Sequence, residues 1–169
     1  MKVVIGIDPG VTGAVAIFRH ASLSTVFDIP STRDTNKSKR KVDVERLRDL
    51  FGEHLWPIEG VFRVYLELSH AMPEQGVSSM FSYGRTSGLI EGLLAGLGFT
   101  STESPIKKVP PAVWKRRLNL LGNAHAKEAA LKKAKVLYPH APLTLVKHHN
   151  RAEAILIGHY GCQMEGLVK

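Results

Sequence analysis

The chain has 169 residues, which at roughly 100–200 residues per domain is enough for one domain with a sizeable core and too few for two large lobes. Hydrophobic residues make up 44% and charged residues 22%, a composition that excludes a mostly disordered chain. Lys and Arg outnumber Asp and Glu by 23 to 15, for a formal net charge of +8. Such a surface favours a polyanionic partner such as nucleic acid or an acidic membrane.

The single cysteine, Cys162, excludes an intrachain disulfide framework and a cysteine-based zinc site. The N-terminal run reaches Asp8 after a short apolar stretch, which is typical of neither a signal peptide nor a transit peptide. The longest apolar stretch, around Leu89–Phe99, is interrupted by Glu91 and is well short of the ~20 residues of a membrane span. We therefore expect a cytoplasmic protein with no membrane partner.

The first elements in chain order are three short β-type runs, which predict a β-meander: Val3–Ile7, Gly13–Phe18 and Thr25–Ile29. The next segment, at about 31–42, is polar and basic with one acid, Asp34, so we expect a flexible basic loop there. A helix begins near Asp43. A further strand, Val61–Leu66, ends at Glu67.

The rest of the chain is mainly helical in pattern, with a strand or connection at Thr100–Val109. The expected helices are Val77–Gly98, Ala112–Leu121, Ala126–Leu137 and Arg151–Glu165. Strands followed by helices predict one α/β domain over residues 1–169 with a mixed sheet.

Four glycines recur every fourth residue of the first long helix and share one of its faces: Gly84, Gly88, Gly92 and Gly96. Each costs about 1 kcal/mol relative to alanine inside a helix, so a close neighbour is expected on that face. The neighbour is either the protein's own sheet or a second subunit.

Acidic residues stand where the expected elements place ligands. Asp8 and Glu67 end predicted strands, the usual ligand position of open α/β sheets. Glu153 begins the last helix, with His149 and Asn150 four and three residues earlier on the same side. Carboxylate oxygens suit Mg²⁺, and such a set predicts a metal site acting on a phosphodiester. Taken singly, each residue has a structural explanation as a helix-end, turn or surface residue.

Several motifs together resemble RuvC-type Holliday-junction resolvases. The segment Gly6-Ile-Asp8-Pro-Gly10-Val-Thr12-Gly-Ala14 resembles the family's opening motif, and Leu66-Glu67 its second acidic position. Two more stretches resemble the later motifs: Pro111-Ala-Val-Trp-Lys115 with Gly122 and Ala126-Lys127, and His148-His-Asn-Arg-Ala-Glu-Ala154. The segment His70–Gly84 and the final motif are most similar to phage RuvC-like proteins and the chloroplast resolvases.

This resemblance implies an α/β fold of the ribonuclease H-like type, with a mixed five-stranded sheet flanked by helices. It also implies a homodimer that nicks four-way DNA junctions in pairs, in homologous recombination, DNA repair or phage DNA processing. Mg²⁺ is the implied cofactor, with Mn²⁺ expected to substitute, and a phage protein would act in the host cytoplasm. The metal ligands carried over by position are Asp8, Glu67 and Glu153. The standard bacterial enzyme has a carboxylate where this chain has Asn150, so we favour His149 as the fourth ligand and Asn150 second.

Basic and aromatic residues supply the expected DNA contacts. The stretch Pro105–Arg151 has eleven Lys and Arg residues against one acid, Glu128. The resemblance places Lys115 and Lys127 beside the scissile phosphate, where an ammonium offsets developing charge; each is otherwise one solvated helix lysine among many. Phe81 and Tyr83 follow the second acidic strand, where the family stacks an aromatic ring on a base, although Phe81 or Met80 fits the core equally. The expected DNA-binding residues are Phe81, Tyr83, Arg85, Lys107, Lys108, Lys115, Arg116, Lys127 and Arg151.

Two other functions fit part of the pattern. Asp8-x-Gly10-x-Thr12 also fits the phosphate-binding hairpin of actin-like and sugar-kinase-like ATPases, but ATP there lies between two domains and this chain has room for one. The second is a junction-binding protein of the same fold that has lost catalysis at Asn150. Cleavage of a four-way junction with and without Mg²⁺ separates these possibilities.

Overall fold

The computed structural model describes residues 2–33, 40–56, 60–68, 76–122 and 125–168. The middle of the expected basic loop, residues 34–39, lies outside the described residues. So do residues 70–75 of the segment His70–Gly84.

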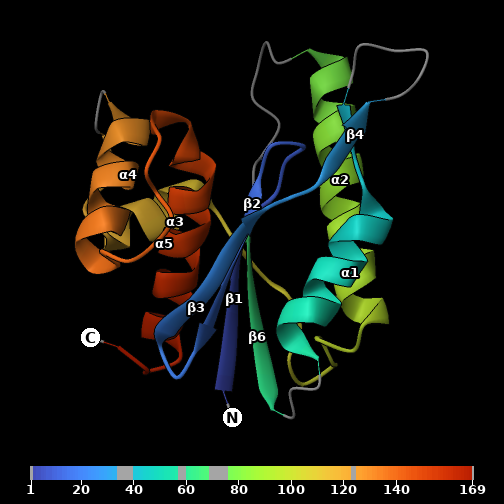
Figure 1. Cartoon of the computed structure of the whole chain (residues 1–169), viewed down its shortest axis with the longest axis horizontal. Helices are drawn as coiled ribbons and strands as arrows, with labels where there is room; N and C mark the ends of the chain where they lie inside the picture. Colours follow the sequence, from blue (N-terminus) through green and yellow to red (C-terminus); the bar gives the residue numbers. More distant parts are fainter. Residues whose placement is uncertain (1, 34–39, 57–59, 69–75, 123–124, 169) are drawn as a thin grey trace.

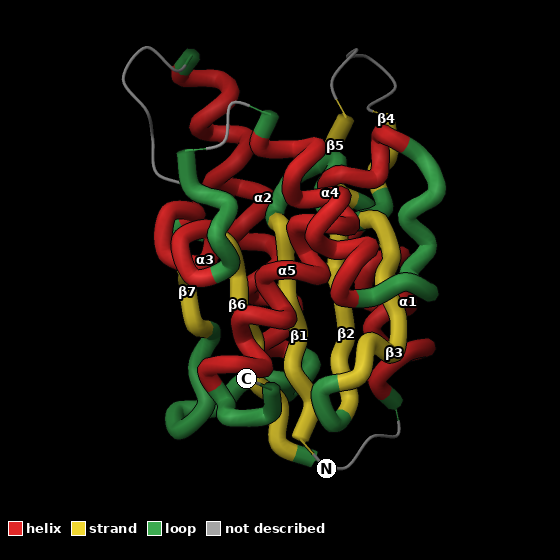
Figure 2. Tube along the Cα trace, turned by 90° about the vertical axis from the view of Figure 1, so that its left-hand side faces the viewer, coloured by secondary structure: helices red, strands yellow, loops and turns green. Residues whose placement is uncertain are grey.

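The central sheet has five strands in the order β3-β2-β1-β6-β7 (Figure 2). Its strands are β1 (Lys2–Asp8), β2 (Ala14–Arg19), β3 (Ser22–Asp28), β6 (Val61–Glu67) and β7 (Lys107–Val109). The first three strands form the expected antiparallel meander, whereas β6 lies parallel to β1 and β7 parallel to β6. The sheet is therefore mixed, with β1 at its centre.

Helices cover both faces of this sheet (Figure 1). They are α1 (Val44–Leu55), α2 (Val77–Gly96), α3 (Pro111–Arg117), α4 (Ala126–Leu137), the 3-10 turn η1 (Val146–His148) and α5 (His149–Met164). One face is covered by α3, α4 and α5, and the other by α1 and α2. Each face of the sheet has its own hydrophobic core. Val4 of β1 packs with residues of α3, α4 and α5 on one face, and Val3, Ile5 and Ile7 pack with residues of α1 and α2 on the other. This double burial explains why β1 is an uninterrupted apolar run.

Two glycines lie where α5 packs against β1 and β2. A Cβ added to Gly6 would meet the backbone of Gly158 and Ala154, and one added to Gly158 would meet the ring of Phe18. These glycines let the helix lie directly on the strand. Sequence patterning pointed instead to the α2 glycines, for which an added Cβ meets nothing within 4 Å. The possibility that their face packs on the protein's own sheet is therefore wrong within the described residues.

The expected loop at about 31–42 and the expected helix Ala112–Leu121 both differ from the structure. The expected loop at about 31–42 has paired ends, because β4 (Ser31–Arg33) and β5 (Arg40–Val42) form an antiparallel ladder. The expected helix Ala112–Leu121 ends at Arg117 instead. Asn119 takes a positive φ of 56°, and the Leu120 N–H bonds the Lys115 carbonyl, a helix-ending arrangement that asparagine tolerates. No helix of the described chain is long and apolar enough to span a bilayer.

Candidate active site

Two of the expected acids lie side by side at one end of the sheet. Asp8 ends β1 and Glu67 ends β6, and these strands are parallel neighbours with Ile7 paired to Leu66. The turn after Asp8 is tight, because the Gly13 N–H bonds the Gly10 carbonyl at 3.0 Å. A Cβ on Gly13 would meet the Asp8 carbonyl, so the turn that follows the acid requires glycine.

Glu153, near the start of α5, completes a group of three carboxylates. The pKa of Asp8 is raised well above its ordinary value by burial and then by the negative charges of Glu153 and Glu67. Burial also raises the pKa of Glu67, and the charge of Glu153 raises it further. Two acids from distant parts of the chain, Glu67 and Glu153, thus both act electrostatically on Asp8.

Two lysines offset this negative charge. Lys115 Nζ lies 3.0 Å from Glu153 Oε1, and the charges of Lys115 and Lys127 both lower the pKa of Asp8. Lys115 also lies 5.0 Å over the ring centre of Trp114. The lysines selected by the motif are therefore close enough to the acids to act on them.

Trp114 is a residue that the sequence analysis missed. Its side chain is 0% exposed, and its Nε1–H donates to Glu67 Oε2 at 2.8 Å. This hydrogen bond lowers the pKa of Glu67, against the larger effect of burial. A tryptophan expected inside a helix beside a motif lysine was the available clue, because a buried indole N–H needs a partner.

His149 and Asn150 take different places. Asn150 Nδ2 donates to the Thr12 carbonyl and, at 3.3 Å, to Thr12 Oγ1, which holds the β1–β2 loop against α5. Its amide nitrogen is thus committed to the protein. His149 is the first residue of α5, one turn before Glu153 on the same side of the helix, and it is half-buried.

The carboxylates of Glu67 and Glu153 are engaged by other side chains of the protein. Within the described ranges no group of three or more His, Cys, Asp or Glu side chains is arranged to hold a metal ion. One oxygen of Glu67 faces Trp114 and one of Glu153 faces Lys115. The donor chemistry nevertheless fits a divalent cation, because the charges of Glu153 and Glu67 raise the pKa of the Asp8 carboxyl, and a positive charge among these carboxylates would stabilise them.

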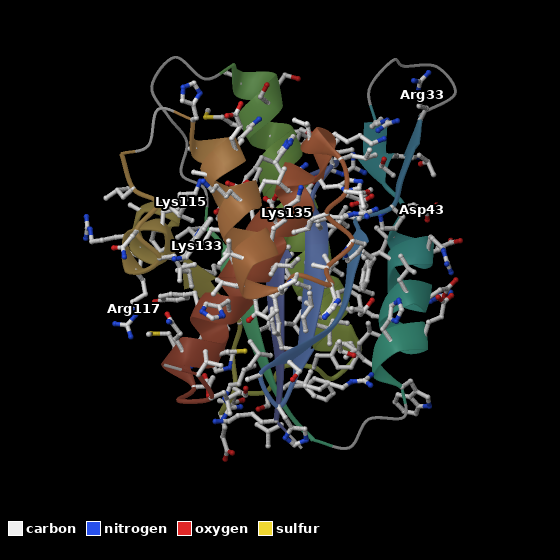
Figure 3. All side chains as sticks on the ribbon, turned by 60° about the vertical axis from the view of Figure 1, so that its left-hand side comes forward. Arg33, Asp43, Lys115, Arg117, Lys133 and Lys135 are labelled. Atoms are coloured by element: carbon white, nitrogen blue, oxygen red, sulfur yellow. The ribbon has the colours of Figure 1, made fainter. Side chains whose placement is uncertain are left out.

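The expected DNA-binding residues divide into two groups. Phe81 on α2 is 72% exposed, and so belongs to no core, while the Tyr83 hydroxyl donates to the Glu67 carbonyl at 3.3 Å. Arg85, Arg116 and Lys127 are exposed. Figure 3 shows Lys115, Arg117, Lys133 and Lys135 together on one side of the molecule, away from Arg33 and Asp43.

Besides Lys115, three further expected DNA contacts are paired with carboxylates of the protein. Lys107 lies 2.6 Å from Glu165, and Lys108 lies 2.9 Å from Glu91. Arg151 donates from Nε and Nη2 to the two carboxylate oxygens of Asp28 at 2.6 and 2.7 Å. This hydrogen-bonded pair lowers the pKa of Asp28 and ties the start of α5 to β3.

Comparison with known proteins supports the motif resemblance. No protein-family model matches the chain. A stretch of 95 residues, 55% of the chain, is 35% identical to the chloroplastic Holliday junction resolvase MOC1 of Chlamydomonas reinhardtii. The matched chain spans about 10% of that relative's length.

A solved structure matches the fold over the whole chain. The structure of Thermus thermophilus RuvC in complex with Holliday junction substrate matches with a TM-score of 0.66 at 20% identity, over 100% of this chain and 99% of that one. The expected ribonuclease H-like fold with a mixed five-stranded sheet is thereby confirmed. The resemblance to RuvC-type resolvases holds in fold across the chain and in sequence over 95 residues.

Proposed function

We propose that this chain is a divalent-metal-dependent endonuclease that resolves four-way DNA junctions by paired nicks. The observation that carries the proposal is the group of three carboxylates at one end of a RuvC-like sheet, with two lysines acting on it. The sequence similarity to a Holliday junction resolvase supports the same substrate.

The residues that would hold Mg²⁺, or Mn²⁺ in its place, are Asp8, Glu67, Glu153 and His149. A divalent cation held there supplies Lewis acidity and a reactive hydroxide for phosphodiester hydrolysis. Asn150 is ranked after His149: its Nδ2 holds Thr12, and only its Oδ1 is left as a donor to a cation. Its role is to keep the β1–β2 loop, and with it Asp8, against the start of α5.

The two lysines have separate tasks in this proposal. Lys115 balances Glu153 in the free protein and offers its charge to the scissile phosphate once DNA is bound. Lys127 is exposed at the start of α4 and approaches the phosphate from the solvent side. Both would offset the charge that develops in the transition state.

The proposed DNA surface follows the basic residues of α3 and α4, of which Lys115, Arg117, Lys133 and Lys135 are labelled in Figure 3. It includes Arg116 and Lys127, with Arg85 and the exposed ring of Phe81 contributed by α2. Lys107, Lys108 and Arg151 are left out because each is paired with a carboxylate that lies outside the proposed metal site. Arg116→Ala should therefore weaken junction binding and reduce its salt dependence by about one ion, whereas Lys107→Ala should not.

Two symmetric nicks require two active sites, and the chain has acids for one. We therefore propose a homodimer, in which two identical sites face a nearly two-fold symmetric junction. The α2 face with Gly84, Gly88, Gly92 and Gly96 is open and is the proposed contact. Sedimentation at micromolar concentration tests the dimer: a chain that stays monomeric even on junction DNA contradicts it.

The decisive experiment is cleavage of an end-labelled four-way junction with and without Mg²⁺. We expect paired nicks with Mg²⁺ and none in EDTA. Asp8→Asn, Glu67→Gln and Glu153→Gln should each abolish nicking while binding in Ca²⁺ persists, because phosphate contacts supply the affinity. Binding without cleavage by the parent protein would instead identify a non-catalytic junction-binding protein.

A further inference from the structure

We propose that Trp114 is a positioning residue that orients the Glu67 carboxylate for cation binding; this inference rests on the proposed function. The indole Nε1–H donates to Glu67 Oε2 at 2.8 Å. With that oxygen held, the plane of the carboxylate is set before any cation arrives.

The indole can set this orientation because it cannot move. Trp114 is 0% exposed and packs in the core formed with α5, together with Val109, Leu118 and Leu120. A large side chain held on all sides has one rotamer open to it. The direction of its N–H is therefore fixed by the core and not by the acid.

The backbone of Glu67 is fixed by the segment that also presents Trp114. Glu67 pairs with Val109 of β7, and the Leu68 N–H donates to the Val109 carbonyl at 2.8 Å. Pro111 begins α3 two residues later, and Trp114 is the fourth residue of that helix. One short stretch, Val109–Trp114, thus holds both the main chain and the side chain of the acid.

A neutral donor suits this task better than a charged one. Lys or Arg at this position would neutralise Glu67 and compete with a divalent cation for it. The indole N–H favours the ionised carboxylate without supplying a charge. The next residue, Lys115, pairs with Glu153 instead, so two consecutive residues of α3 contact two different acids by different means.

The hydrogen bond is tested without an activity assay. The chain has two tryptophans, and Trp56 is 78% exposed, so Trp56→Phe leaves Trp114 as the only indole. In ¹⁵N-labelled Trp56→Phe protein, the single indole N–H resonance should shift when Glu67→Gln is added and when MgCl₂ is titrated. An indole N–H resonance whose chemical shift does not change with Glu67→Gln overturns the inference.

Metal affinity tests the consequence. Trp114→Phe fills most of the same space without an N–H, and we expect Mn²⁺ binding by calorimetry to weaken about 10–100-fold, as for other groups that orient metal ligands. Leu120→Ala is the matched control: it removes an apolar side chain from the same core as Trp114, and should lower the unfolding temperature while Mn²⁺ affinity stays at the parent value. A folded Trp114→Phe protein with parent Mn²⁺ affinity overturns the inference.

Failure of the proposed function gives a different result. If the parent binds Mn²⁺, Trp114→Phe weakens that binding and the parent still cleaves no junction, then the inference is supported and the proposed nuclease activity is wrong.

Discussion

Lys115 Nζ lies 3.0 Å from Glu153 Oε1 and joins α3 to α5 across the candidate active site. Both side chains are largely buried, with 22% and 14% of their surface exposed. In the free protein the ammonium occupies a place beside carboxylates that a divalent cation also favours. The lysine therefore influences every acid of the group, including Asp8, whose pKa it lowers.

Loss of Lys115 should shift the pH dependence of cleavage. The pKa of Asp8 is raised by burial, by Glu153 and by Glu67, and lowered by Lys115 and Lys127. Lys115→Met removes one lowering charge, so that pKa rises further. Asp8 binds a cation only when ionised, above its pKa, so the acid limb of the pH–rate profile should move to higher pH.

The control is Lys132→Met, which removes the same charge from an exposed position on α4. Its profile should coincide with that of the parent, measured as initial nicking rates at one fixed Mg²⁺ concentration below saturation. An unmoved acid limb in Lys115→Met would show that Lys115 does not act on Asp8.

Substitutions of His149 and Asn150 should differ in their effects on stability and on the Mg²⁺ requirement of nicking. Asn150 donates to Thr12, so Asn150→Ala should lower the free energy of unfolding by about 1 kcal/mol, the usual value of one hydrogen bond. Asn150→Asp should lower it at least as much, because a carboxylate cannot donate to the Thr12 carbonyl. His149→Ala should leave unfolding unchanged and raise the Mg²⁺ concentration needed for half-maximal nicking.

Urea unfolding and Mg²⁺ titration of the nicking rate provide these values. Tighter use of Mg²⁺ by Asn150→Asp would show that the side chain at position 150 reaches the cation and would place it beside His149 in the ligand set.

Glycine substitutions should have opposite effects in α5 and α1. A Cβ on Gly158 would enter the ring of Phe18, so Gly158→Ala should destabilise the protein by about 3 kcal/mol, as overpacked cores do. Gly52 of α1 has open space, so Gly52→Ala should stabilise by about 0.5–1 kcal/mol through helix propensity. Chemical denaturation compares the two. Equal effects would mean that α5 does not lie on the sheet as described.

The carboxylate of Glu165 should make stability fall at acid pH. It is 8% exposed and accepts hydrogen bonds from Lys107 at 2.6 Å and Tyr65 at 2.8 Å. Burial raises its pKa, but these bonds and the one with Lys2 outweigh burial and lower it to about 2, from 4.5. A lowered pKa contributes stability above pH 4.5 that is lost as the pH falls toward 2.

Glu165→Gln should therefore lower the free energy of unfolding by about 2–3 kcal/mol at pH 7. The difference from the parent should shrink between pH 4.5 and 2. A difference that stays constant over this range would rule out ionisation as its cause.

Local patterns in the sequence determined the strands, the long helices and the three acids. Asp8 and Glu67 were placed at strand ends because an apolar run followed by an acid is a short-range feature, and β1 and β6 end where expected. Parallel pairing then brings the two strand ends together whatever the rest of the fold. Glu153 followed from the motif that opens the last helix.

Contacts between distant residues were decided only by the tertiary structure. Arg151 and Lys107 were expected on DNA because both are cationic, yet each meets a carboxylate far away in the chain, Asp28 and Glu165. The Trp114 indole donates to Glu67, which is 47 residues away in the chain, and no local pattern in the sequence indicates that these two residues meet. The glycine repeat of α2 is a visible pattern that meets no other part of the described chain, whereas no spacing pattern marks Gly6 and Gly158 as the glycines that allow α5 to reach the sheet. A side chain's type and spacing limit what it can bind, but which partner it meets depends on the packing of whole layers.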